Sequence, residues 1–189
     1  MARRRSPVRR LASRRLPSRR LLAAALVLLV VVLLRLADQF APIAPPDSLQ
    51  PGMHQVERVV DGDTLLLAGG ARVRLIGADT PETVKPDHPV EPFGPEATAF
   101  TERFVAEGDG QVRLEFDGPR KDKYDRFLAT VWVGDRMLNE ELLRAGLARL
   151  RDNYRFSPPL KVRLQIAYQA AKLTQRGLHG PLPSPAPQQ

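Results

Sequence analysis

Two glycine-containing turns divide the region after residue 52 into three short segments of strand-forming residues. Asp61-Gly62 separates Met53–Val60 from Thr64–Leu67. Gly69-Gly70 then separates the second segment from Ala71–Gly77. Asp-Gly and Gly-Gly dipeptides favour the tight turns of β-hairpins, because glycine adopts a positive φ at little steric cost. The spacing therefore predicts an antiparallel three-stranded meander.

Two further strands and three helices are predicted beyond the meander. Gln111–Phe116 alternates apolar and polar residues, and Leu128–Val133 is a largely apolar run around Trp132, as in strands with buried faces. Proline, asparagine and serine at helix starts and glycine at helix ends give three helices: Pro95 to Gly108, Asn139 (as N-cap) to Gly146, and Ser157 to Gly177. This order predicts an α+β fold, a five-stranded OB-fold-like β-barrel with three packed α-helices.

The segments outside this region differ from it in composition. Residues 1–20 contain nine arginines and no acidic residue, and are interpreted as a disordered basic tail. The apolar run 21–37, in which only Arg35 is charged, is interpreted as a signal anchor or transmembrane helix. A cleaved signal peptide is the alternative. Proline-rich stretches at 38–52 and 181–189 are interpreted as a spacer and a tail, which leaves 53–180 as the folded domain.

The charge is unevenly distributed. The net charge of +8 arises in the N-terminal arginines, and residues 36–189, with 19 basic and 21 acidic residues, carry about −2. The positive-inside rule places the arginine-rich tail in the cytoplasm and the domain outside the cell membrane; secretion is the alternative. A nucleic acid would be held by a local basic patch. The chain has no cysteine, which excludes disulfides and thiolate metal sites.

Two short acidic segments enclose an arginine and form a candidate site. Asp61-Gly62-Asp63-Thr64 precedes Arg74, and Asp79-Thr80-Pro81-Glu82 follows it. A second arginine, Arg126, closes the segment that begins at Asp122. Carboxylates bind hard cations, and guanidinium groups bind phosphate in a fixed fork. Each acidic segment alone is more typical of a polar turn or a helix N-cap than of a site, so the interpretation depends on their combination.

In order and spacing, these segments resemble the staphylococcal nuclease (thermonuclease) family. The resemblance extends over about residues 55–180 and implies an OB-fold barrel and a Ca²⁺-dependent phosphodiesterase that acts on DNA and RNA. The segments that carry it are Val60-Asp61-Gly62-Asp63-Thr64, Val73-Arg74-Leu75, Asp79-Thr80-Pro81-Glu82-Thr83, Phe93-Gly94-Pro95-Glu96-Ala97, Asp122-Lys123-Tyr124-Asp125-Arg126, and Leu138-Asn139 through Gly146-Leu147-Ala148.

The resemblance also implies roles for individual residues. Asp63, Asp79 and the backbone carbonyl of Thr80 would bind the metal, and this all-oxygen set suits Ca²⁺ or Mg²⁺ better than Zn²⁺. Glu82 would act as general base or orient the attacking water. The other residues would contact phosphate or base: Arg74 and Arg126 at the scissile phosphate, with Lys121, Lys123, Tyr124 and Tyr154 binding the rest of the substrate.

The chain departs from the family pattern at several positions. Asp125 stands where the family commonly has glycine, and Asp152 stands where a base-stacking tyrosine is expected. These departures bear on substrate affinity. Two other functions remain open, a non-catalytic OB-fold nucleic-acid-binding module tethered to a membrane and a membrane adaptor that works through the basic tail. No protein partner is predicted, and a monomer is expected.

Overall fold

The computed structural model describes residues 28–30, 32–33, 48–83 and 89–181. The chain divides into two compact units, Met1–Pro42 and Ile43–Gln189. In the first unit residues 28–30 and 32–33 are helical, while the rest of the predicted basic tail and signal anchor, most of the spacer and the C-terminal tail from residue 182 lie outside the described residues. Within the described ranges, no helix has the length and apolarity needed to cross a membrane.

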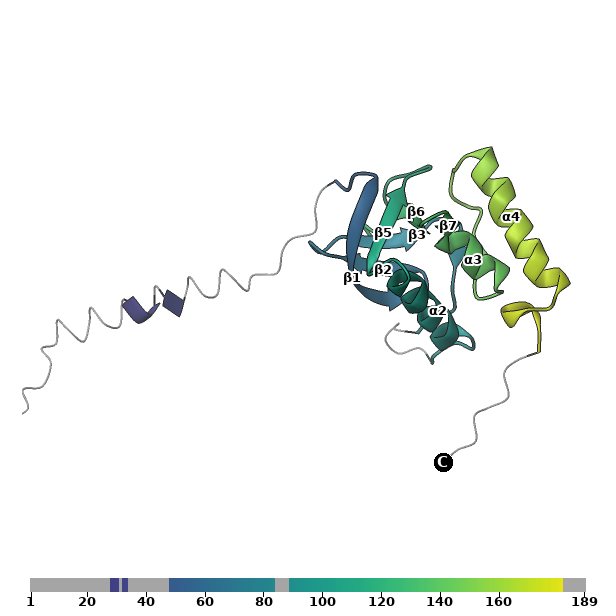
Figure 1. The fold of residues 1–189 in the computed structure, drawn as a ribbon, viewed down its shortest axis with the longest axis horizontal. Coiled ribbons are helices and arrows are strands. Elements are labelled where there is room, and N and C mark those ends of the chain that lie inside the picture. The colour runs from purple at the N-terminus through teal and green to yellow at the C-terminus, as the bar shows by residue number, and fades with distance from the viewer. Residues whose placement is uncertain (1–27, 31, 34–47, 84–88, 182–189) are drawn as a thin grey trace, which may run out of the picture. The chain divides into compact units, whose positions relative to one another are not determined.

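Five strands of the second unit form a closed barrel, as the sequence predicts (Figure 1). Antiparallel pairing gives the order β3-β2-β1-β5-β6, and a parallel pair between β3 and β6 closes it. Their bounds are β1 Gly52–Asp61, β2 Thr64–Leu67, β3 Arg72–Leu75, β5 Gln111–Glu115 and β6 Phe127–Val133.

The burial pattern of the strands follows their sequence alternation. In β5, Val112 and Leu114 are completely buried while Gln111 and Glu115 are exposed. β6 is buried along its first five residues because its two neighbours in the barrel, β3 and β5, cover both edges and α3 packs against it. The apolar residues of each strand therefore meet in one core inside the barrel.

Three helices pack on the barrel, α2 (Gly94–Ala106), α3 (Leu138–Arg144) and α4 (Pro158–Leu173). α2 contacts β1, and α3 lies between β6 and α4 (Figure 1). The predicted start of α4 is confirmed, since the Ser157 hydroxyl accepts a hydrogen bond from the Leu160 amide. Its predicted end is wrong: the helix stops at Leu173, and Gly177 begins a separate 3₁₀ turn, η1 (Gly177–His179).

The prediction that Asn139 caps the second helix is also wrong. α3 begins one residue earlier, at Leu138, and the Asn139 side chain is fully buried. Its amide nitrogen donates to the carbonyls of Ile76 (2.8 Å) and Ala129 (3.2 Å), and its oxygen accepts from the amide of Val131 (3.0 Å). Asn139 thus connects the end of β3 to β6, because a buried amide must satisfy its hydrogen bonds inside the protein.

Three two-residue strands were not predicted, β4 (Ala78–Asp79), β7 (Arg136–Met137) and β8 (Arg149–Leu150). β4 pairs antiparallel with β8, so Asp79 lies opposite Arg149 although they are 70 positions apart. Strands this short carry no detectable alternation, which explains why the sequence does not reveal them.

Candidate active site

The β1–β2 turn, β3 and β4 bring Asp63, Arg74 and Asp79 together. Thr64 at the start of β2 pairs with Arg74 in β3, so the side chain of Arg74 reaches the β1–β2 turn that carries Asp63. Arg74 Nη1 lies 2.5 Å from Asp63 Oδ1, and Arg74 Nη2 donates to Asp79 Oδ1. One guanidinium group therefore joins the two acidic segments that the sequence analysis singled out.

The turn before β2 is held in place by close packing. The carbonyl of Gly62 accepts a 2.6 Å hydrogen bond from the Thr101 hydroxyl of α2. A Cβ atom at Gly62 would lie only 2.8 Å from the Ala97 Cβ and from the Thr80 Oγ1 atom, which is closer than side-chain atoms approach one another. Glycine is thus required where the turn meets α2 and Thr80, and this contact positions Asp63.

Asp63 is a buried carboxyl group with a strongly perturbed pKa. Its side chain is 1% exposed, and it accepts hydrogen bonds from the Thr80 amide (2.8 Å) and the Thr64 hydroxyl (3.0 Å). Burial raises its pKa from 3.8 to about 8; the positive charge of Arg74 offsets part of this rise, and neighbouring Asp61 adds to it. Arg74 alone therefore does not provide enough positive charge to keep the buried Asp63 carboxylate ionised.

Two carboxylates of the kind that binds hard cations lie together here. Asp63 and Asp79 are oxygen donors that share one guanidinium group, and the Thr80 backbone adjoins Asp63. In the part of the chain that the structure describes, no three His, Cys, Asp or Glu side chains gather closely enough to hold a metal ion. Glu82 follows β4, is partly exposed, and accepts a hydrogen bond from the Thr83 amide (3.2 Å).

Arg126 is held by a different carboxylate. Asp122 accepts hydrogen bonds from Arg126 Nε (2.9 Å) and Nη2 (2.7 Å), and from the amides of Arg126 (3.1 Å) and Tyr124 (2.9 Å). Burial of Asp122 favours its neutral form, but these hydrogen bonds outweigh burial and lower the pKa below 3.8. The loop 122–126 is thus closed around one ionised carboxylate, which orients the guanidinium group of Arg126.

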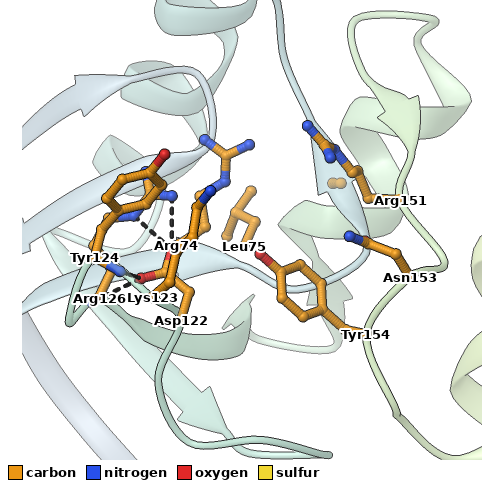
Figure 2. Close-up of a pocket in the computed structure, with 10 residues that line it drawn as sticks. Arg74, Leu75, Asp122, Lys123, Tyr124, Arg126, Arg151, Asn153 and Tyr154 are labelled. Carbon is orange, nitrogen blue, oxygen red and sulfur yellow. Dashed lines mark hydrogen bonds and ion pairs between the residues drawn. The ribbon is translucent and has the colours of Figure 1, made fainter.

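A pocket of about 400 Å³ lies between this loop and the segment after β8. Figure 2 shows Asp122, Lys123, Tyr124 and Arg126 on one side of the pocket, with Arg74 in the middle. The opposite side is formed by three residues of the segment that follows β8, Arg151, Asn153 and Tyr154.

The structure thus brings five of the predicted site residues to this pocket and leaves others outside it. Arg74, Lys123, Tyr124, Arg126 and Tyr154 line it. Asp63 and Asp79 bind Arg74, and Thr80 binds Asp63, but none of the three lines the pocket. Glu82 is not among its lining residues either.

Lys121 is directed elsewhere. Its Nζ atom binds the carboxylate of Asp125 (2.8 Å) and lies 4.6 Å from the centre of the Phe127 ring. Asp125 itself has a φ of 62°, a left-handed conformation that glycine adopts freely and that aspartate tolerates better than most residues. This conformation explains why glycine suits the position that Asp125 occupies. The negative charge of Asp125 is paired with Lys121.

Sequence reasoning missed Arg151 and Asn153. Both line the pocket, and Arg151 Nε lies 3.2 Å from Asp79 Oδ2. Their position depends on the β4–β8 pair and on a hydrogen bond from the Arg151 amide to the Gly77 carbonyl (3.0 Å). The only local signal was their closeness in sequence to Tyr154.

The chain is similar in sequence to several known proteins. The sequence model of a family described as "Staphylococcal nuclease homologue" matches residues 72–179. The thermonuclease of Staphylococcus hyicus is 45% identical over 126 residues, which cover 64% of this chain and 72% of the relative. The thermonuclease of Staphylococcus intermedius is 47% identical over 124 residues (64% and 70%), and the endonuclease YncB of Bacillus subtilis is 36% identical over 143 residues (66% of each).

Proposed function

Because this chain belongs to the staphylococcal nuclease family, a nuclease family that hydrolyses phosphodiester bonds of nucleic acids, we propose that it is a Ca²⁺-dependent enzyme with its active centre at Arg74. One observation supports this site above the others. Arg74 joins Asp63 and Asp79 on one side and lines the pocket with Arg126 on the other. The carboxylates that suit a metal and the arginines that suit a phosphate therefore meet at one point.

Asp63, Asp79 and the carbonyl of Thr80 would hold the metal. The bound ion would supply positive charge beside the phosphate and lower the pKa of a water molecule. The donors are all oxygens, and Ca²⁺ accepts six to eight oxygen ligands in adaptable geometry, with water and phosphate oxygens included. The burial that raises the pKa of Asp63 supports the proposal, because a cation here would favour the ionised carboxylate.

Arg74 and Arg126 would bind the scissile phosphate from two directions. Both side chains are largely buried, with 17% and 22% exposure, and both are oriented by carboxylates. A pre-oriented guanidinium group needs no rearrangement as negative charge grows on the phosphate oxygens, so it stabilises the transition state more than the bound substrate.

Glu82 would accept a proton from the attacking water or orient that water. It is a partly exposed carboxylate three residues after Asp79, which suits a group that must reach solvent beside the metal ligands. Lys123, Tyr124 and Tyr154 line the pocket and would contact the rest of the nucleotide. Lys121, which is paired with Asp125 outside the pocket, would act only on more distant phosphates.

Hydrolysis of single-stranded DNA by the full-length chain tests the proposal. We expect cleavage with Ca²⁺, none with excess chelator, and a decrease of about 10²- to 10⁴-fold in Glu82→Gln, because a general base contributes a factor of that size. Glu102→Gln is the matched control, since Glu102 is an exposed glutamate on α2 and does not line the pocket. Binding of DNA without cleavage would instead support the non-catalytic module, and undiminished cleavage by Glu82→Gln would contradict the role of Glu82.

A further inference from the structure

The third arginine of the pocket, Arg151, differs from the other two in how it is held. Its side chain is 53% exposed, against 17% for Arg74 and 22% for Arg126. Its ion pair with Asp79 is formed by the Nε atom, and among the described residues its two Nη atoms donate no hydrogen bond. Two donor groups of Arg151 are therefore available on the pocket side of the segment after β8.

The position of Arg151 complements that of Arg126. Figure 2 shows Arg126 and its loop on one side of Arg74, and Arg151 with Asn153 on the other. The pocket between them, at about 400 Å³, is within the size range of ligand sites. A polynucleotide carries a phosphate at every nucleotide, so a chain bound at Arg74 presents further phosphates on either side of the scissile one.

A purely structural role explains Arg151 less well. The segment is already held by its backbone, since the Arg151 amide donates to Gly77 and β8 pairs with β4. Asp79 already binds Arg74, so it does not depend on Arg151 for a positive partner. Neither the fold of the segment nor the neutralisation of Asp79 requires this exposed guanidinium group.

We propose that Arg151, with the amide of Asn153 beside it, forms a second phosphate subsite that binds a phosphate adjacent to the scissile one. The proposal rests on the proposed function for the identity of the ligand as a nucleic acid. It implies that the site favours a polynucleotide over a substrate with a single phosphodiester group, because only the former fills both subsites.

The salt dependence of binding tests the subsite directly. The probe is a short fluorescein-labelled oligothymidylate, and its fluorescence anisotropy is measured with the full-length chain in chelator over a series of KCl concentrations. Each phosphate contact to a single strand contributes about 0.7 to the slope of log K against log salt. We expect Arg151→Ala to reduce that slope by about 0.7 and to weaken binding about five- to tenfold at low salt.

Two variants serve as controls for this measurement. Arg149→Ala removes an arginine that is equally exposed (53%), pairs with Glu91 and does not line the pocket, so the slope is expected to be unchanged. Arg151→Lys keeps the charge that neutralises the phosphate and should keep the slope. An unchanged slope in Arg151→Ala, or an equal reduction in Arg149→Ala, would overturn the subsite.

Kinetics separate the subsite from a role in holding Asp79. With Ca²⁺, Arg151→Ala should raise the KM for oligothymidylate about five- to tenfold with kcat within about twofold. It should leave hydrolysis of thymidine 5′-(4-nitrophenyl phosphate), which has one phosphodiester, unchanged. Equal losses on both substrates would show that Arg151 acts through Asp79 and would overturn the proposal. If the wild-type chain hydrolyses neither substrate, the proposed function fails, and the salt slope still decides whether the subsite exists.

Discussion

Two Asp–Arg pairs of this molecule are made of the same residue types and behave in opposite ways. In the barrel wall, Arg74 is shared by Asp63 and Asp79, and burial raises the pKa of Asp63 to about 8. In the loop 122–126, burial of Asp122 also acts against ionisation, but hydrogen bonds from Arg126 and two amides lower its pKa below 3.8.

The difference lies in how strongly burial acts on each carboxylate and in the charges around it. Asp122 accepts four hydrogen bonds from its own loop, so the charge is satisfied and the pair acts as a structural clamp. Asp63 is more deeply buried, has another carboxylate nearby and shares its only guanidinium partner. The first pair is complete without a ligand, whereas the second has the electrostatics of a site that a cation would complete.

Replacement of the arginine in each pair by alanine should give the largest difference between the two pairs, in the free energy of unfolding. We expect Arg74→Ala and Arg126→Ala each to lower kcat/KM about 10²- to 10³-fold, because each removes a donor to the phosphate. The free energy of unfolding should fall by about 3 kcal/mol in Arg74→Ala, which removes a hydrogen-bond donor from buried Asp63 and another from Asp79. It should fall by only about 1 kcal/mol in Arg126→Ala, since Asp122 keeps its backbone donors. Urea unfolding measures both, and equal losses would contradict the comparison.

Added Ca²⁺ should stabilise the protein through Asp63 and not through Asp122. At a Ca²⁺ concentration of about 100 times Kd, the wild-type domain should gain about 2.7 kcal/mol of stability over the chelated protein. Asp63→Asn should abolish this gain, because it removes a proposed ligand, and Asp122→Asn should retain it. Thermal unfolding of the full-length chain with and without Ca²⁺ checks the result. The hypothesis of a metal site at Asp63 is wrong if Asp63→Asn gains as much as the wild type.

Acid should release the loop clamp. The folded-state pKa of Asp122 is lowered, so its stabilising contribution is fully present above the unfolded value of about 3.8 and is lost as pH falls through the folded pKa. Asp122→Asn should therefore be about 1.5 kcal/mol less stable than the wild type at neutral pH, where it lacks the charged acceptor. The two proteins should become equal in stability well below pH 3.8, and urea midpoints at both pH values test this. A difference that persists in acid would contradict the clamp.

The barrel was predictable because its signals are local. Asp61-Gly62 and Gly69-Gly70 mark the turns of the meander, and alternation marks β5. Asn139 was misread because an asparagine before an apolar run has the same sequence signature whether it caps a helix or enters the core. Only burial between β3 and β6 decides between them.

The sequence alone determined the order of the five barrel strands and three helices along the chain, the family resemblance, and the presence of two acidic segments around Arg74, because turns, periodicity and spacing are properties of neighbouring residues. Tertiary structure decided which of these side chains meet. The closed barrel buries Asp63 and raises its pKa, loop closure turns Lys121 toward Asp125, and β4–β8 pairing places Arg151 against Asp79. Such contacts join positions up to 72 residues apart, and no local pattern records them.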